Sequence, residues 1–293
     1  MRPCKTKKTP QSPGNDRTLE ESLLSINQVT TREQWSLRKA IEGYAAQGIQ
    51  GIAVWRDKMK EAGGAEVAAR LLADHGMQVS GFCVGGLLTA SDNAGFHDRL
   101  DDNRRIIEEA ATISARTTIF VAGGLPEGSK DIARARAQIL GVWQNSCQKQ
   151  KGSGVKLALE PLHPRIAPNR SVLTTLREAN YWCDQLGDGP ELGITIDVYH
   201  VWWDPELEDQ IARAGSRVAA FHVNDWLMDT QDLRLDRGMM GDRIIDIPKI
   251  RGWVEAAGYG GHREVEIFSE RNWWRKPAEE VVRTIKERYQ TAV

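Results

Sequence analysis

Short runs of β-branched and apolar residues alternate with segments of helical hydrophobic spacing along almost the whole chain. Runs of this length, separated by helical patterns, predict parallel strands joined by right-handed crossovers. The eight expected strands are 23–30, 51–55, 79–84, 117–121, 155–160, 192–198, 217–223 and 263–268. Eight such units in residues 21–293 predict a single (β/α)8 TIM barrel of the α/β class.

Residues that commonly begin or end helices occur at the boundaries that this alternation predicts. Several helical segments end at a glycine in the place where a left-handed C-cap is expected, and Thr31 is expected to cap the first helix. These glycines are Gly48, Gly76, Gly187, Gly215 and Gly258. An open doubly wound sheet is the rival fold, but it would usually carry a glycine-rich phosphate loop after its first strand. This chain reads INQVTTREQW there, so the barrel is preferred.

Residues 1–20 are rich in Lys, Pro, Ser, Gly and Asn and show no hydrophobic period. We expect a flexible N-terminal tail over 1–20 and one barrel domain over 21–293. The basic start is followed by polar residues, which a secretory signal would not show.

The charge balance, the apolar runs and the cysteines of the sequence indicate which binding partners and which compartment to expect. Lys and Arg total 39 and Asp and Glu total 40, for a net charge of −1. This balance gives no electrostatic reason to expect a nucleic acid or an anionic membrane as partner. No apolar run approaches the roughly 18 residues of a membrane helix. Four cysteines without C-x-x-C spacing indicate free thiols in a reducing compartment. We therefore expect a cytoplasmic protein.

Ionisable residues occur where the last four predicted strands end, which in a barrel is the catalytic face. Burying such groups is unfavourable unless they are paired or bound to a cation. One hypothesis explains all four positions, namely that they converge on one divalent metal ion. The residues are Glu160, Asp197, His222 and Glu266. Three carboxylates and one imidazole favour Mn²⁺ or Mg²⁺, with Co²⁺ and Zn²⁺ as alternatives. Taken singly, each residue would more simply be a capping, salt-bridge or core side chain.

Four segments resemble the xylose isomerase-like barrel superfamily, which includes sugar isomerases, ketose 3-epimerases, inosose dehydratases and endonuclease IV-type repair enzymes. The segments are LALEPLHP, ITIDVYHVWW, FHVND and VEIF. The resemblance covers nearly all of the chain after residue 20 and implies the same four metal ligands. It also implies that His200 contacts substrate. Arg237 corresponds to an arginine that follows the metal histidine in the epimerases, although the intervening loop is longer here.

Aromatic residues follow several of the strand ends. Flat indole faces stack on the C–H faces of sugar rings, so we expect a substrate-binding rim there. Simple capping of the barrel, or packing at a subunit interface, would explain the tryptophans equally well. The residues expected to bind substrate are Trp55, Arg56, His163, Trp203, Trp226 and Arg237.

The leading hypothesis is a metal-dependent isomerase or epimerase acting on a ketosugar, polyol or related carbohydrate through an enediolate. Glu160 or Glu266 takes a proton next to the carbonyl, and the other glutamate returns one to the opposite face. The alternative is a lyase or dehydratase that eliminates a group from an inosose or 3-keto-glycoside, including deglycosylation. In that case His200 would protonate the leaving oxygen.

Two further hypotheses come from other classes. An endonuclease IV-type enzyme would need extra His and Glu ligands and a basic groove, but this chain has six histidines and net charge −1. A barrel that has lost catalysis would bind no divalent ion. The expected partners are a small carbohydrate substrate and further copies of the chain in a homo-oligomer, with neither nucleic acid nor membrane.

Overall fold

The computed structural model describes residues 19–293 except 91, 150–152 and 188–190. The tail expected over residues 1–20 therefore lies almost entirely outside the described residues.

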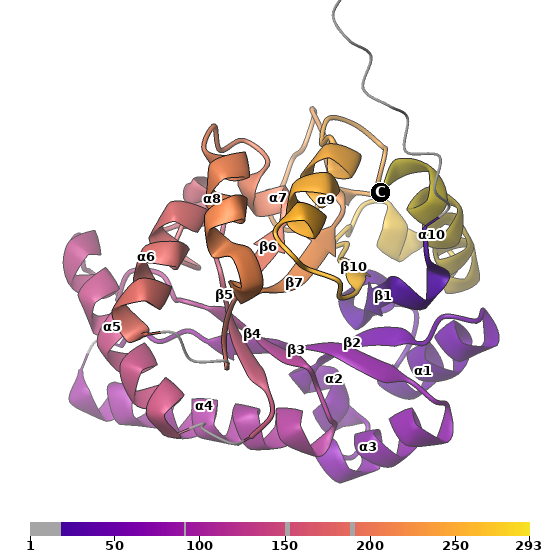
Figure 1. Ribbon diagram of the computed structural model, residues 1–293. Helices are drawn as coiled ribbons and strands as arrows, with labels where there is room; N and C mark the ends of the chain where they lie inside the picture. Colours follow the sequence, from indigo (N-terminus) through magenta and orange to yellow (C-terminus); the bar gives the residue numbers. More distant parts are fainter. Residues whose placement is uncertain (1–18, 91, 150–152, 188–190) are drawn as a thin grey trace, which may run out of the picture.

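Eight parallel strands close into one barrel (Figure 1), which confirms the predicted fold. Around the barrel the strands follow chain order, and the eighth returns to pair with the first. The strands are β1 (Leu24–Asn27), β2 (Gly51–Trp55), β3 (Gln78–Gly86), β4 (Thr117–Val121), β5 (Lys156–Glu160), β6 (Leu192–Asp197), β7 (Val218–Val223) and β10 (Arg263–Val265). A short antiparallel ribbon, β8 (Asp225–Trp226) and β9 (Arg237–Gly238), lies between β7 and β10 in the chain.

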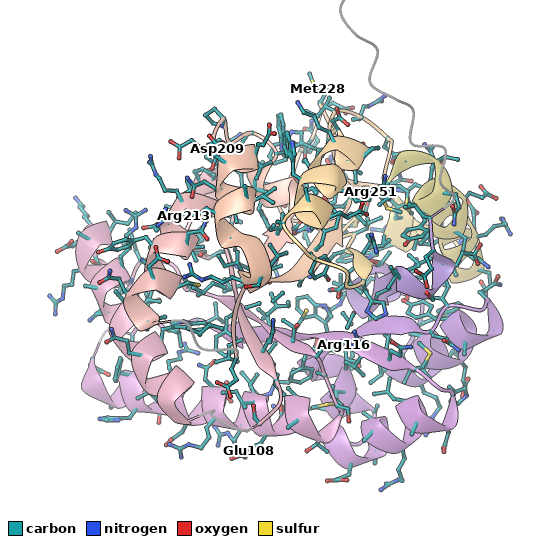
Figure 2. All side chains as sticks on the ribbon, viewed as in Figure 1. Glu108, Arg116, Asp209, Arg213, Met228 and Arg251 are labelled. Carbon is teal, nitrogen blue, oxygen red and sulfur yellow. The ribbon has the colours of Figure 1, made fainter. Side chains whose placement is uncertain are left out.

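Helices cover the outside of the barrel (Figure 1). They are α1 (Leu37–Ala46), α2 (Arg56–Glu61), α3 (Ala65–Asp74), α4 (Asn93–Thr112), α5 (Ile132–Lys149), α6 (Leu176–Leu186), α7 (Val198–Val201), α8 (Leu207–Ala214), α9 (Ile247–Ala256) and α10 (Ala278–Ala292). The described residues also form 3-10 turns: η1 (Glu21–Leu23), η2 (Gln28–Thr31), η3 (Pro164–Ile166), η4 (Gly215–Arg217) and η5 (Trp273–Arg275). Exposed charged side chains such as Glu108 of α4 and Asp209 and Arg213 of α8 lie on the outer helix faces (Figure 2).

The predicted helix ends are confirmed at the glycines and wrong at Thr31. All five glycines have positive φ, between 53° at Gly215 and 97° at Gly258. The first helix instead begins after Ser36, whose hydroxyl accepts a hydrogen bond from Lys39 N–H. Thr31 ends η2, and its buried hydroxyl hydrogen-bonds the Tyr44 hydroxyl at 2.7 Å. A side chain engaged in the core cannot cap a helix that begins six residues later.

The register of the parallel strands brings the polar strand ends together. Asp197 of β6 pairs with His222 of β7, and His222 in turn pairs with Glu264 of β10. Alternate residues of a strand face the same side, so Glu266, two residues after Glu264, is expected to face the same way. The closed sheet thus holds these side chains at one end of the barrel.

Two observations concern compartment and membrane. Cys83 is a buried free thiol, as predicted, and Cys183 is also buried; Cys4 lies outside the described residues, and nothing is described of the Cys147 side chain. Within the described ranges, no helix is long and apolar enough to span a bilayer.

Candidate metal centre

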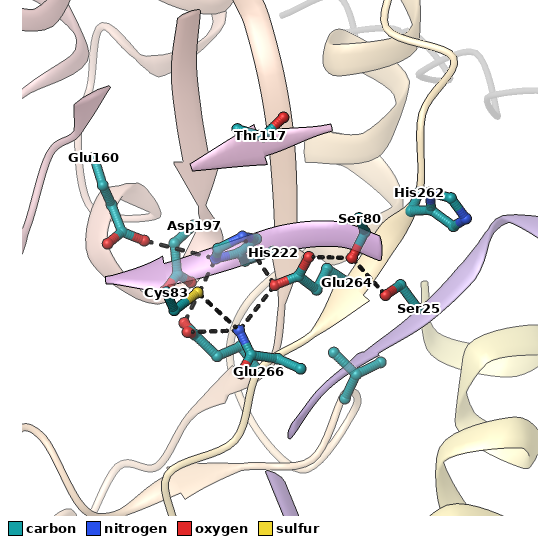
Figure 3. A network of polar contacts seen from close by, with 12 residues as sticks. Ser25, Ser80, Cys83, Thr117, Glu160, Asp197, His222, His262, Glu264 and Glu266 are labelled. Atoms are coloured by element: carbon teal, nitrogen blue, oxygen red, sulfur yellow. Dashed lines mark hydrogen bonds and ion pairs between the residues drawn. The ribbon is translucent and has the colours of Figure 1, made fainter. Parts of the chain in front are cut away.

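The four predicted ligands meet at the C-terminal end of the barrel (Figure 3). Each offers one ligand atom, and these atoms all lie within 4.8 Å of one another. Glu160 ends β5, Asp197 ends β6, His222 lies on β7 and Glu266 directly follows β10. All four are buried, with Asp197 and His222 fully inaccessible to solvent.

The His222 ring shows that this cluster fits a cation. Its Nδ1 lies 3.6 Å from Glu160 Oε1 and 3.5 Å from Glu266 Oε2, yet it makes no hydrogen bond. A buried polar atom without a partner requires an explanation. A divalent ion among these groups supplies one, because carboxylate oxygens and an imidazole nitrogen are ordinary ligands of such ions. The four residues could therefore hold a metal ion.

Burial and mutual charge shift the pKa values within the cluster. Burial raises the pKa of Glu160 to about 8, and the charge of Glu266 adds to this effect. Burial alone would lower the pKa of His222, but the carboxylates of Glu264 and Glu266 raise it to about 10. In the metal-free protein at neutral pH, Glu160 and His222 therefore carry protons that a bound ion would displace.

Glu264 is a buried carboxylate to which the sequence analysis gave no role. Its Oε1 lies 3.3 Å from His222 Nε2, on the ring edge that faces away from the other ligands. The hydroxyl of Ser80 donates to its Oε2 at 2.7 Å (Figure 3). Asn27 Nδ2 donates to its Oε1 at 2.8 Å. Metal-binding histidines commonly direct their second nitrogen at a carboxylate in this way. The signal was available in the sequence, since Glu264 lies two residues before Glu266 in the run predicted as the last strand, and residues two apart in a strand face the same side.

Asn27, at the end of β1, links the first strands to the cluster. Its Nδ2 also donates to Glu266 Oε1 at 3.0 Å. Its Oδ1 accepts hydrogen bonds from Trp55 Nε1 at 2.7 Å and from Val29 N–H at 3.1 Å. The amide is thereby fixed in orientation, and it in turn fixes the Glu266 carboxylate.

Arg237 lies directly beside two of the ligands. Its Nη1 donates to Asp197 Oδ2 at 2.8 Å and to Glu266 Oε2 at 3.0 Å. Burial alone would raise the pKa of Asp197, but the charge of Arg237 lowers it well below the usual range. The guanidinium carbon lies 4.6 Å from the Tyr199 ring centre and 4.9 Å from that of Phe268, within cation–π range. Arg237 therefore offsets carboxylate charge at the centre.

His200 borders the cluster without belonging to it. Its Nε2 lies 3.7 Å from Asp197 Oδ2 and 3.1 Å from Arg237 Nη2, and its Nδ1 accepts the His163 backbone N–H at 3.1 Å. Burial lowers the pKa of His200 to about 3, against the opposing charge of Asp197. In the metal-free protein the imidazole is therefore neutral at physiological pH, with one ring nitrogen carrying a proton.

A cavity of about 260 Å³ opens beside the ligands. Glu160 and Glu266 both line it, together with His200, and apolar side chains such as Leu162 and Phe268 form other parts of its wall. Its volume is near the lower end of the range for small-molecule sites. The cavity therefore suits a small polar molecule that reaches both glutamates.

Two of the residues expected to bind substrate, Trp55 and Arg237, line this cavity. Arg56 does not. Its Nη1 donates to Asp102 Oδ1 at 2.8 Å and its Nη2 to Glu109 Oε1 at 3.1 Å, both on α4. These carboxylates hold the guanidinium between α2 and α4, away from the site.

His163, Trp203 and Trp226 are also absent from the cavity lining among the described residues. The His163 and Trp226 rings pack 4.9 Å apart, and Trp226 packs 4.7 Å from the Tyr199 ring. Trp203 Nε1 donates to the backbone oxygen of His200 at 2.8 Å. These contacts fit simple capping of the barrel better than a sugar-binding rim.

Two arginines that line the cavity, Arg170 and Arg234, were not among the candidates. Both lie in loops without hydrophobic periodicity, so the sequence offered no pattern that would place them there.

Comparisons with known proteins agree with this architecture. A family model described as xylose isomerase-like TIM barrel matches residues 41–288. Protein SMc04130 from Sinorhizobium meliloti 1021 is 45% identical and superposes with a TM-score of 0.90, covering 93% of this chain and 99% of that one.

More distant structures share the fold. The IolI protein, solved with a zinc atom, is 19% identical with a TM-score of 0.78, covering 91% of this chain and 96% of that one. A D-allulose 3-epimerase from Methylomonas sp. is 16% identical with a TM-score of 0.74, covering 94% and 99%. At such identities the likeness concerns the fold alone. None of the curated proteins searched matches the chain.

Proposed function

The chain belongs to the xylose isomerase-like TIM barrel family, and on that premise we propose that it is a divalent-metal-dependent sugar isomerase or epimerase. Its substrate would be a ketosugar, a polyol or a related carbohydrate, and its reaction the transfer of a proton on the carbon next to a carbonyl. One observation carries the proposal. Glu160 and Glu266 both belong to the candidate metal cluster and both line the same small cavity.

The two glutamates are placed to act on one substrate from different sides. They come from β5 and from the end of β10, which lie three strands apart around the barrel. One carboxylate takes a proton from the substrate carbon, and the other returns a proton to the opposite face.

A divalent ion held by Glu160, Asp197, His222 and Glu266 would polarise the substrate carbonyl and its neighbouring hydroxyl, lowering the energy of the enediolate. The oxygen-rich donor set supports Mn²⁺ as the ion. Zinc is the first alternative to test, because the IolI structure holds a zinc atom in the same fold.

Elimination stays the alternative reaction, because it starts from the same proton abstraction and needs only a proton donor for the leaving oxygen in the same cavity. The observations weigh against the endonuclease IV-type hypothesis. An endonuclease IV-type site requires several ions with additional ligands. In the part of the chain that the structure describes, the possible metal ligands form a single group of four.

Solvent-deuterium exchange tests the proposal. The protein, loaded with Mn²⁺ or Zn²⁺ in D₂O, is incubated with a panel of ketoses, inososes and 3-keto-glycosides and followed by NMR. We expect deuterium at the carbon next to the carbonyl of at least one sugar. Turnover of a sugar without deuterium incorporation would instead indicate a hydride shift and would contradict the two-base mechanism.

A further inference from the structure

Two arginines line the cavity without any carboxylate partner. Arg170 follows η3 in the loop after β5, and Arg234 lies in the loop between β8 and β9. Among the residues that the structure describes, neither guanidinium makes a hydrogen bond or an ion pair. Arg170 is half-buried and Arg234 is exposed. Arg56, which is also half-buried, by contrast pairs with Asp102 and Glu109.

The two guanidinium groups repel each other. Burial lowers the pKa of Arg170, and the nearby charge of Arg234 lowers it further, while Glu160 opposes this effect. A guanidinium does not lose its proton under physiological conditions, so two like charges persist at the cavity wall. A bound anion would supply the partner that both guanidinium groups lack, because guanidinium groups bind carboxylates and phosphates with paired hydrogen bonds.

The position of the pair relates the anion to the chemistry. Arg170 and Arg234 line the same cavity as Glu160 and Glu266, and Asn169 adds an amide beside Arg170. A ligand that fills a cavity of about 260 Å³ therefore contacts both the metal cluster and the arginines. We propose that the substrate is an anionic sugar, whose carboxylate or phosphate binds Arg170 and Arg234 while its carbonyl end lies at the glutamates. This inference rests on the proposed function and adds the substrate class to it.

Binding measurements separate this inference from catalysis. The Mn²⁺-loaded full chain is titrated calorimetrically with D-fructose, D-fructose 6-phosphate and 5-keto-D-gluconate, which differ in the presence and type of anionic group. We expect at least one anionic probe to bind about tenfold or more tightly than fructose, since a bidentate ionic hydrogen bond is among the stronger polar contacts. The preferred probe identifies the anion as phosphate or carboxylate.

Variants assign this preference to the arginines. Arg170→Gln and Arg234→Gln should each remove about tenfold of the affinity for the preferred anionic probe and change the affinity for fructose less than twofold. Arg165→Gln is the matched control, because Arg165 is exposed, lies in the same loop as Arg170 and is not part of the cavity wall. Circular dichroism and metal content verify that each variant is folded and loaded.

The outcomes are distinct. Wild-type protein that binds neither anionic probe more tightly than fructose overturns the inference, and so do Arg170→Gln and Arg234→Gln variants that keep the preference. Deuterium exchange into neutral ketoses alone would leave the proposed function standing and reject the anionic substrate. Anion binding through the two arginines, with no exchange into D-fructose 6-phosphate, 5-keto-D-gluconate or any sugar of the neutral panel, would reject the proposed function instead.

Discussion

The two halves of the barrel differ in the side chains that their strands carry to the catalytic face. The first four strands end in neutral residues: Asn27 for β1, Trp55 for β2, Gly86 for β3 and Val121 for β4. Strands β5, β6, β7 and β10 supply all four candidate ligands and lie next to one another in the barrel. Carboxylates concentrated on neighbouring strands can share one ion, whereas charges spread around the ring could not.

The half of the barrel formed by β1 to β4, called the neutral half below, shapes the cavity and orients carboxylates of the other half. Trp55, Cys83 and Val121 line the cavity opposite the charged strands. Asn27 is the main polar link between the halves, through its hydrogen bonds to Glu264 and Glu266. The comparison therefore predicts that substitutions in the second half affect metal binding and turnover strongly, and those in the first half weakly.

The largest effect is expected at Asp197 and His222. Asp197→Ala or His222→Ala should weaken divalent-ion binding by more than about 100-fold, beyond the usual loss for a residue that only supports a ligand. Elemental analysis and calorimetric titration measure this. Thr195→Val is the matched control, since Thr195 lies on the same strand, and its buried hydroxyl has no hydrogen-bond partner in the described structure. Full metal content in either alanine variant would show that the ligand set is wrong.

The next effect concerns the two proposed bases. Glu160→Gln and Glu266→Gln keep a ligand oxygen and the side-chain size but remove the proton acceptor. Turnover should fall by about 100-fold or more, the usual size of a lost general base, while part of the metal binding remains. Glu270→Gln, an exposed position in the loop after Glu266, should leave kcat unchanged. Unimpaired turnover in either cluster variant would exclude that glutamate as a base.

Metal binding should also depend on pH. The pKa of Glu160 is about 8 and that of His222 about 10 in the metal-free protein. Both groups must lose their protons to bind an ion, so affinity should rise between pH 6 and pH 8, by about tenfold per pH unit for each proton released. Calorimetry at pH 7 in buffers of different ionisation enthalpy counts these protons. Affinity that stays constant from pH 6 to pH 8 would mean that the cluster is already deprotonated.

The smallest effect is expected in the neutral half. Asn27→Ala removes a hydrogen-bond donor from Glu264 and Glu266 but no ligand. Metal affinity should fall less than tenfold, while the free energy of unfolding decreases by about 1–3 kcal/mol because buried carboxylate oxygens lose a partner. Metal titration and urea unfolding measure the two effects. A loss of metal affinity as large as that in Asp197→Ala would show that the two halves do not differ in their effect on metal binding.

The sequence alone was sufficient to predict the fold and the four-residue cluster, because both depend on patterns among residues that are close together in the chain. The strand runs have clear periods, and each ligand occurs at or beside the end of a strand whose neighbours are fixed by the closed barrel. The position of Glu264 near the cluster could also have been predicted, because it lies two residues before Glu266. Its role could not, because that role depends on which edge of the His222 ring it faces.

Residues in loops and on helices could not be placed in the same way. Arg56 directly follows a strand, but its side chain forms ion pairs with two carboxylates on α4. No local sequence pattern connects these carboxylates with Arg56. Arg170 and Arg234 reach the cavity from two loops that are 64 positions apart in the sequence. Such contacts depend on the three-dimensional path of the loops, which the hydrophobic periodicity of the sequence does not predict.

Anomalous X-ray scattering from crystals grown with Mn²⁺ would locate the metal ion and identify its ligands. We expect one strong manganese peak about 2.0–2.6 Å from carboxylate oxygens of Glu160, Asp197 and Glu266 and from a ring nitrogen of His222. A manganese peak bound elsewhere, or no peak at these four residues with saturating Mn²⁺, would contradict it.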